Sequence, residues 1–145
     1  MRKLLVLSML AVGLTSNVHA QGKPPEMGKY TTAYSGGEGY QVFIARFGLK
    51  ENQEALVQIN GIDHKLDGRV IRAKAIPSGS GASVKYTATV DGQALELLSI
   101  ESTKAVLRVT GAPWQSDLCY DKSLVTERPP QHLLTDYLDG TQQRK

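Results

Sequence analysis

Cysteine is the scarcest informative residue in this chain, with Cys119 alone in 145 residues. A single thiol excludes an internal disulfide, so the hydrophobic core must hold the fold together. We interpret Cys119 as a buried, small apolar residue, with a disulfide to a second molecule as the alternative. A catalytic thiol is not expected, because neither a histidine nor an electropositive setting is evident near it.

Histidine is also scarce, which limits the chemistry that the chain can perform. Of the three histidines, only His64 and His132 lie outside the first 20 residues. Neither belongs to a nucleophile motif such as Gly-x-Ser-x-Gly, and no histidine or cysteine pair has the spacing of zinc ligands. The segment Ser78–Gly81 lacks the Gly-Lys-Ser/Thr continuation of a phosphate-binding loop. We therefore expect no enzyme, with no catalytic residue, no metal site and no cofactor.

A strong charge of either sign is absent. The formal net charge is +3, and removing Arg2 and Lys3 from the 17 basic residues leaves 15 against 14 acidic residues. No run of Lys and Arg and no basic amphipathic helix is present. This near balance argues against nucleic acid or an anionic membrane as a partner.

The first 20 residues have the pattern of a cleaved export signal. A basic start, Met1–Lys3, precedes the apolar run from Leu4 to Leu14, and Val18-His19-Ala20 places small or apolar residues at −3 and −1. The apolar run is shorter than the ~20 residues that span a bilayer. We predict cleavage after Ala20 and a periplasmic location, with residues 21–145 forming a single domain.

Short β-branched and aromatic runs, separated by turn signals such as Asn60-Gly61 and Asp91-Gly92, occupy the centre of the chain. The expected strands are Tyr40–Phe47, Glu54–Ile59, Arg69–Ile76, Val84–Val90, Gln93–Ile100, Ala105–Thr110 and Leu118–Tyr120. This pattern predicts an all-β fold, either an antiparallel β-sandwich or a barrel-like meander of about eight strands.

The two ends of the domain differ from its centre. Residues 21–39 are rich in Gly, Pro, Ser and Thr and are expected to be irregular. Pro129-Pro130, an apolar face that includes Leu133 and Leu134, and Gly140 predict a short helix over 131–139 that packs across the sheet.

The segment from Pro77 to Tyr86 is the candidate functional site. Six small residues, Ser78–Ser83, cannot contribute to a core, and they predict an exposed loop that leads into a strand. The candidate binding residues are Ser80, Gly81, Ser83, Lys85 and Tyr86. Tyr86 has a second interpretation as a core residue, because it shares a strand face with Val84, Ala88 and Val90.

Ser83-Val84-Lys85-Tyr86, at a loop-to-strand junction of a short exported β protein, resembles the periplasmic inhibitors of i-type (invertebrate) lysozyme. Members of that family carry Ser-Gly-x-Tyr on a protruding loop, and Val84 stands at the glycine position here. The general residue pattern of the chain, from Leu56–Gly61 to Leu133–Leu138, is also similar to that family.

The resemblance implies that the loop enters the active-site cleft of an i-type lysozyme and so protects peptidoglycan, a role in evading host defence. Ser83 and Tyr86 would donate hydrogen bonds to the catalytic carboxylates, and Lys85 would add a contact near the rim. It also implies a homodimer, for which a spare edge strand would offer a surface. The alternatives are a non-inhibitory periplasmic binding or adaptor module, or an inhibitor of another lysozyme type.

Overall fold

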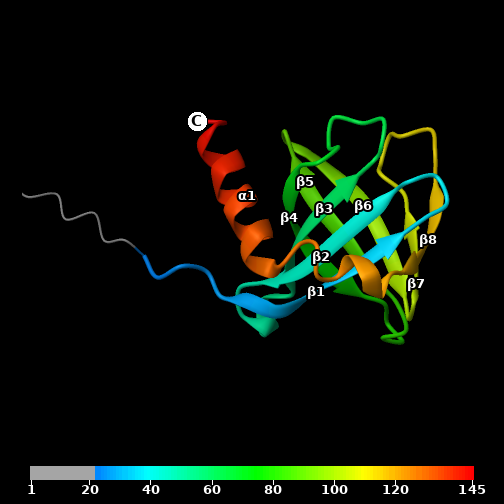
Figure 1. Cartoon of the computed structure of the whole chain (residues 1–145), viewed down its shortest axis with the longest axis horizontal. Helices are drawn as coiled ribbons and strands as arrows, with labels where there is room; N and C mark the ends of the chain where they lie inside the picture. Colours follow the sequence, from blue (N-terminus) through cyan, green and yellow to red (C-terminus); the bar gives the residue numbers. More distant parts are fainter. Residues whose placement is uncertain (1–21) are drawn as a thin grey trace, which may run out of the picture.

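Eight antiparallel strands follow one another around a closed barrel, and the first strand meets the last (Figure 1). The computed structural model describes residues 22–145, so the expected export signal over residues 1–20 lies outside the described residues. The strands are β1 (Met27–Ser35), β2 (Gln41–Phe47), β3 (Glu54–Asn60), β4 (Val70–Pro77), β5 (Val84–Val90), β6 (Gln93–Glu101), β7 (Lys104–Leu107) and β8 (Ser116–Tyr120). Two 3-10 turns, η1 (Lys50–Asn52) and η2 (Lys122–Leu124), and the helix α1 (Pro130–Gln142) complete the chain. The predicted all-β fold with a C-terminal helix is confirmed, and of its two forms the barrel is the one observed.

The prediction that residues 21–39 are irregular is wrong, because β1 lies within them. Their glycines and hydroxyl residues conceal an alternation in which Tyr30, Thr32 and Tyr34 line the inside of the barrel while Thr31 and Ala33 face outward. Threonine and tyrosine favour strands, so the local preference was present but weak. The α1 helix also extends further at both ends than the predicted 131–139.

The barrel encloses one hydrophobic cluster, and a second lies outside it. Inward-facing residues of the strands fill the interior, among them Val42, Ile44, Val57, Ile59, Ile71, Leu97, Leu98, Leu107 and Leu118. The outer cluster consists of Ala33, Phe43, Ala45, Phe47, Leu56, Val70, Leu124, Leu133 and Leu134. Strands β2 and β3 are therefore buried on both faces, whereas β5 keeps the apolar-in, polar-out alternation of a strand with one wet face.

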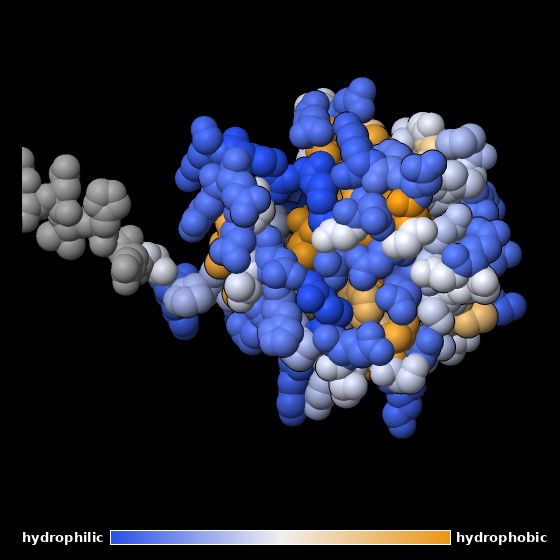
Figure 2. All heavy atoms as spheres, turned by 45° about the horizontal axis from the view of Figure 1, so that its top comes forward, coloured by the Kyte–Doolittle hydropathy of each residue, from blue (hydrophilic) through white to orange (hydrophobic). Residues whose placement is uncertain are grey.

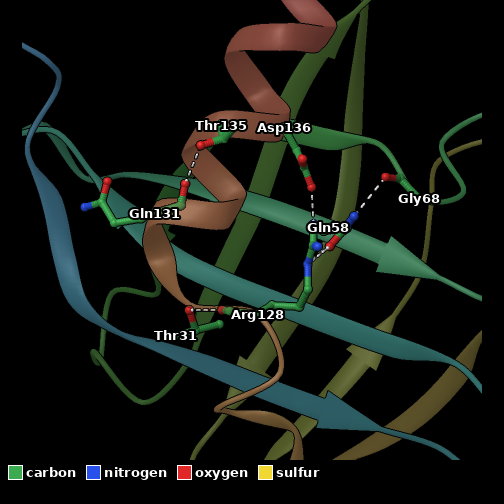
Figure 3. Close-up of polar contacts among 7 residues, drawn as sticks. All are labelled: Thr31, Gln58, Gly68, Arg128, Gln131, Thr135 and Asp136. Carbon is green, nitrogen blue, oxygen red and sulfur yellow. Dashed lines mark hydrogen bonds and ion pairs between the residues drawn. The ribbon is translucent and has the colours of Figure 1, made fainter.

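A polar network fixes α1 over the outer face of the barrel (Figure 3). Arg128 donates from Nε to the side-chain oxygen of Gln58 at 2.9 Å and from its guanidinium to Asp136 of the helix. Gln58 in turn donates to the carbonyl of Gly68 at 2.9 Å, and Thr31 donates to the carbonyl of Arg128 at 2.7 Å. Gln58 and Thr31 are the buried polar residues among the described ones, and both have partners, as burial of a polar group requires.

The barrel closes through a short seam between β1 and β8. Two residue pairs are in register there, Tyr34 with Tyr120 and Ser35 with Cys119. Asp121 extends the seam: its backbone N–H donates to the carbonyl of Ala33 at 2.9 Å, and its carboxylate accepts the Ser35 hydroxyl at 2.8 Å. The same carboxylate accepts the backbone N–H of Ser123 at 3.0 Å and so begins η2.

Two further expectations fail at this seam. Cys119 is exposed on β8, because its inward-facing neighbour Leu118 takes the buried position. In the described part of the chain every strand has a neighbour on both sides, so the spare edge strand on which a homodimer was expected to form is not present.

Hydrophilic residues cover most of the surface in Figure 2, and hydrophobic residues are visible mainly in recesses between them. No helix within residues 22–145 combines the length and the apolar character needed to cross a membrane.

We expect the packing of α1 to be a large contributor to stability. Leu133 is fully buried and Leu138, on the same helix, is 41% exposed. Leu133→Ala should lower the free energy of unfolding by about 2–5 kcal/mol, whereas Leu138→Ala should change it by no more than about 0.5 kcal/mol. Urea denaturation of both variants checks this, and equal effects would mean that the helix is not docked through Leu133.

The Asp121 carboxylate should make the seam sensitive to acid. Hydrogen bonds from Ser123 and Ser35 hold its pKa below the ordinary value. A carboxylate with a depressed folded-state pKa stabilises the protein above its unfolded-state pKa of about 3.9, and the contribution is lost as the pH falls through the folded-state value.

Asp121→Asn should therefore lower the thermal midpoint at pH 7, and the difference from the parent protein should narrow below about pH 4. Thermal unfolding of both proteins between pH 2 and pH 8 measures it. A difference that stays constant across this range would contradict a role for the ionised carboxylate.

Candidate functional site

The loop between β4 and β5 is closed by its own hydrogen bonds. The N–H of Ser78 donates to the carbonyl of Ser83 at 2.8 Å, and the N–H of Gly81 donates to the carbonyl of Ser78 at 2.8 Å. The Ser78 hydroxyl accepts the N–H of Ser83 at 3.2 Å and lies 3.3 Å from the hydroxyl of Ser80. Gly81 has a φ of 71°, a conformation that glycine adopts without strain. The predicted exposed loop is thus an ordered turn with an exposed tip.

The structure divides the predicted site residues among different surfaces. Ser80 and Gly81 lie at the exposed tip, and Ser83 lies where the loop enters β5. Lys85 faces outward and forms an ion pair with Glu96 of β6 at 3.2 Å. Tyr86 faces inward and packs against the interior cluster of the barrel. Ser80 and Ser83 are linked through Ser78, but Lys85 and Tyr86 point to opposite sides of the sheet.

Tyr86 lies on the inward face of β5, as its interpretation as a core residue predicts. Its ring is half-buried in the barrel end, and burial raises the pKa of its phenol above the ordinary value, with nearby Tyr34 adding to the shift. The hydroxyl has no hydrogen-bond partner within residues 22–145, and no buried side-chain nitrogen or oxygen in that part of the chain lacks one. The hydroxyl is therefore not fully buried, and Tyr86 lines a hollow at the end of the barrel where the loop begins.

A second hairpin stands beside the loop and extends the candidate site. Ser83 lines a depression of about 580 Å³ together with residues of the β6–β7 hairpin, namely Ser99, Ile100, Glu101, Ser102, Thr103, Lys104 and Val106. Antiparallel pairing of Val84 with Ile100 brings this turn to the end of the loop. Pairing the residues of β5 and β6 outward from the Asp91-Gly92 turn gives nearly the same register. The sequence therefore contained a signal that the β6–β7 turn lies next to the loop.

His64 and His132, the histidines of the described residues, belong to other segments than the candidate loop. Within residues 22–145, no three His, Cys, Asp or Glu side chains are grouped so that they could hold a metal ion. The Nδ1 atom of His64 accepts the N–H of Leu66 at 3.2 Å within the β3–β4 loop, and His132 is exposed at the start of α1. What the arrangement offers is a set of hydroxyl and N–H groups on two adjacent hairpins, which suits recognition of a partner.

Comparison of the chain with models of known protein families, with curated proteins and with solved structures finds no match. By its fold and its candidate site, the protein is an eight-stranded antiparallel barrel that presents an ordered hairpin loop at one end.

The hydroxyl of Tyr86 should contribute little to stability, because it has no protein partner. We expect Tyr86→Phe to change the free energy of unfolding by less than about 0.5 kcal/mol, and Tyr86→Ala to lower it by about 2 kcal/mol through loss of ring packing. Chemical denaturation of the two variants provides the measurement. A loss in Tyr86→Phe as large as that in Tyr86→Ala would show that the hydroxyl is bound within the folded protein.

Proposed function

We propose that this protein is a periplasmic inhibitor of i-type lysozyme that places the β4–β5 loop in the active-site cleft of the enzyme. The observation that carries the proposal is the loop itself, which is narrow, exposed at its tip and held by hydrogen bonds between its own residues. The resemblance of Ser83–Tyr86 to the inhibitor motif supports the choice of target.

The loop suits a cleft that contains carboxyl groups. Lysozymes act through a pair of carboxyl groups across the cleft, one of which serves as the general acid. Residues 78–83 carry no charge, so the loop would bring no repelling carboxylate into the cleft. Their hydroxyl and N–H groups can donate to a carboxylate, and hydrogen bonds to charged groups contribute about 1.5–3 kcal/mol each.

The order of the loop also favours binding. A segment that is already held in its bound conformation loses less conformational entropy when it associates. In this proposal Ser80, Gly81 and Ser83 contact the enzyme, and the ring of Tyr86 supports the base of the loop from inside the barrel. Lys85 is engaged with Glu96, while Lys104 on the neighbouring hairpin has no ion pair within residues 22–145 and can contact the acidic rim of the cleft.

The direct test is the lysis of a peptidoglycan suspension by i-type, c-type and g-type lysozymes, with and without the purified protein. We expect inhibition of the i-type enzyme only. Inhibition of another type would redirect the proposal to that enzyme. No effect on any of them would contradict it and favour a non-inhibitory binding or adaptor module.

Two glycines of the loop provide a matched pair of variants. A Cβ at Gly79 or at Gly81 meets no atom within 4 Å, but only Gly81 has a positive φ. Alanine in that conformation costs about 1–2 kcal/mol, so Gly81→Ala should weaken inhibition by about tenfold, while Gly79→Ala should leave it unchanged.

Ser83→Ala should weaken inhibition by a similar factor of about ten, because it removes one donor to the cleft. Its thermal midpoint should match that of the parent protein, which separates a lost contact from a lost fold. Equal inhibition by Gly81→Ala, Ser83→Ala and the parent would show that the loop is not the binding element.

A further inference from the structure

The barrel is open at the end where the loop stands. A hollow of about 450 Å³ lies there, lined by Tyr30, Thr32, Ile44, Arg46, Lys50, Gln53, Glu54, Ala55, Ala75, Pro77, Val84 and Tyr86. These residues come from β1 to β5, from the η1 turn and from Gln53, which directly follows that turn. The barrel is hollow here because alanines occupy the inward positions of β3 and β4 where larger side chains fill the deeper levels. Mouths of β-barrels are common ligand sites, and this volume lies within the usual range of about 300–1,000 Å³.

The walls of this hollow are largely apolar. Ile44 and Ala55 are nearly inaccessible and form its deepest part, and Ala75, Pro77 and Val84 line its side. Tyr30 is 69% exposed although it faces the hollow, so a large aromatic surface lies open to solvent at the rim. An apolar body bound here would cover Tyr30 and would meet the free hydroxyl of Tyr86.

The charged groups at the rim are predominantly cationic. Lys50 lines the hollow and has no ion pair within residues 22–145. Arg46 donates to the carbonyl of Gly48 and to Glu26, which holds its guanidinium at the open side. Glu54 is the acidic residue that lines the hollow, but Arg72 at 2.7 Å and Lys74 at 3.1 Å bind its carboxylate. Because Glu26 pairs with Arg46 at 2.9 Å, the unpaired charge among the described lining residues is the positive charge of Lys50.

We propose that the mouth of the barrel binds an amphipathic carboxylate, with the apolar chain against Ile44, Ala75 and Tyr86 and the carboxylate next to Lys50. A medium-length acyl chain fits the chemistry, because the walls offer apolar contact and the rim offers a cation. The neutral hydroxyls of Tyr86 and Thr32 accommodate the transition from apolar to polar along the ligand.

The experiment compares two probes of opposite charge, decanoate and decyltrimethylammonium, each below its micellar concentration. Titration followed by methyl and amide NMR should show saturable shifts at Ala55, Ala75 and Val84 with decanoate, and much weaker ones with the cation. Lys50→Glu should reduce the affinity for decanoate by about fivefold, the scale of reversing one exposed charge. Lys145→Glu makes the same charge change at the C-terminus, beyond α1, none of whose residues line the hollow, and it should bind like the parent protein.

Ala75→Leu fills the hollow and should abolish the shifts. If that variant does not fold, Lys50→Glu and the two probes still decide the question. The proposal is overturned if decanoate gives no saturable shift, if both probes bind equally, if Lys50→Glu binds decanoate as the parent does, or if the shifts map along α1. No lysozyme takes part, so the result is independent of the inhibitor proposal.

Discussion

The closure of the barrel at Asp121 is the constraint on which the other features depend. Strands β1 and β8 share two residue pairs, whereas the other neighbouring strands share four or more, so hydrogen bonds from Ser35 and to Ala33 through Asp121 complete the contact. On the interior side the rings of Tyr34 and Tyr120 meet edge to face, with their centroids 6.0 Å apart. The same aspartate starts η2 and directs the chain toward α1. If this seam opened, the interior cluster would be exposed to water and the mouth would lose its shape.

The helix α1 covers an apolar surface on the outside of the barrel. The strands of a barrel need apolar residues only on the inward face, but β2 and β3 are apolar on both faces. Their outer face must therefore be covered by another element to be kept from water. Leu133 and Leu134 supply that cover, and the bonds between Arg128, Gln58 and Asp136 fix its position. A buried glutamine without these partners would cost about 1–3 kcal/mol, so the network confines the helix to an arrangement that satisfies Gln58. The helix lies along the outside of the barrel (Figure 1), and no residue of α1 lines the hollow.

The local sequence pattern predicts the strands in which apolar and polar residues alternate clearly. It does not predict contacts between residues that lie far apart in the sequence. The β5–β6 hairpin follows from the alternation over Val84–Val90 and from Asp91-Gly92. Strand β1 was missed because its inward residues Tyr30, Thr32 and Tyr34 alternate with Thr31 and Ala33, a pattern with little contrast between apolar and polar residues. The loop was predictable from composition alone. The hollow was not, since its lining residues come from five strands and the η1 turn, which only the closure of the barrel brings together.

The loop and the hollow share a boundary at the pair formed by Pro77 and Val84. This pair closes the β4–β5 ladder, supports the loop above it and lines the hollow beside it. A ligand against Val84 and Tyr86 would therefore contact the base of the loop, while a partner that grips the tip would touch only Ser80, Gly81 and Ser83. Because the loop is held by its own hydrogen bonds, its shape does not require a filled hollow. The two surfaces can thus act independently, and communication between them would have to pass through Pro77 and Val84, where the structure offers a short and direct contact.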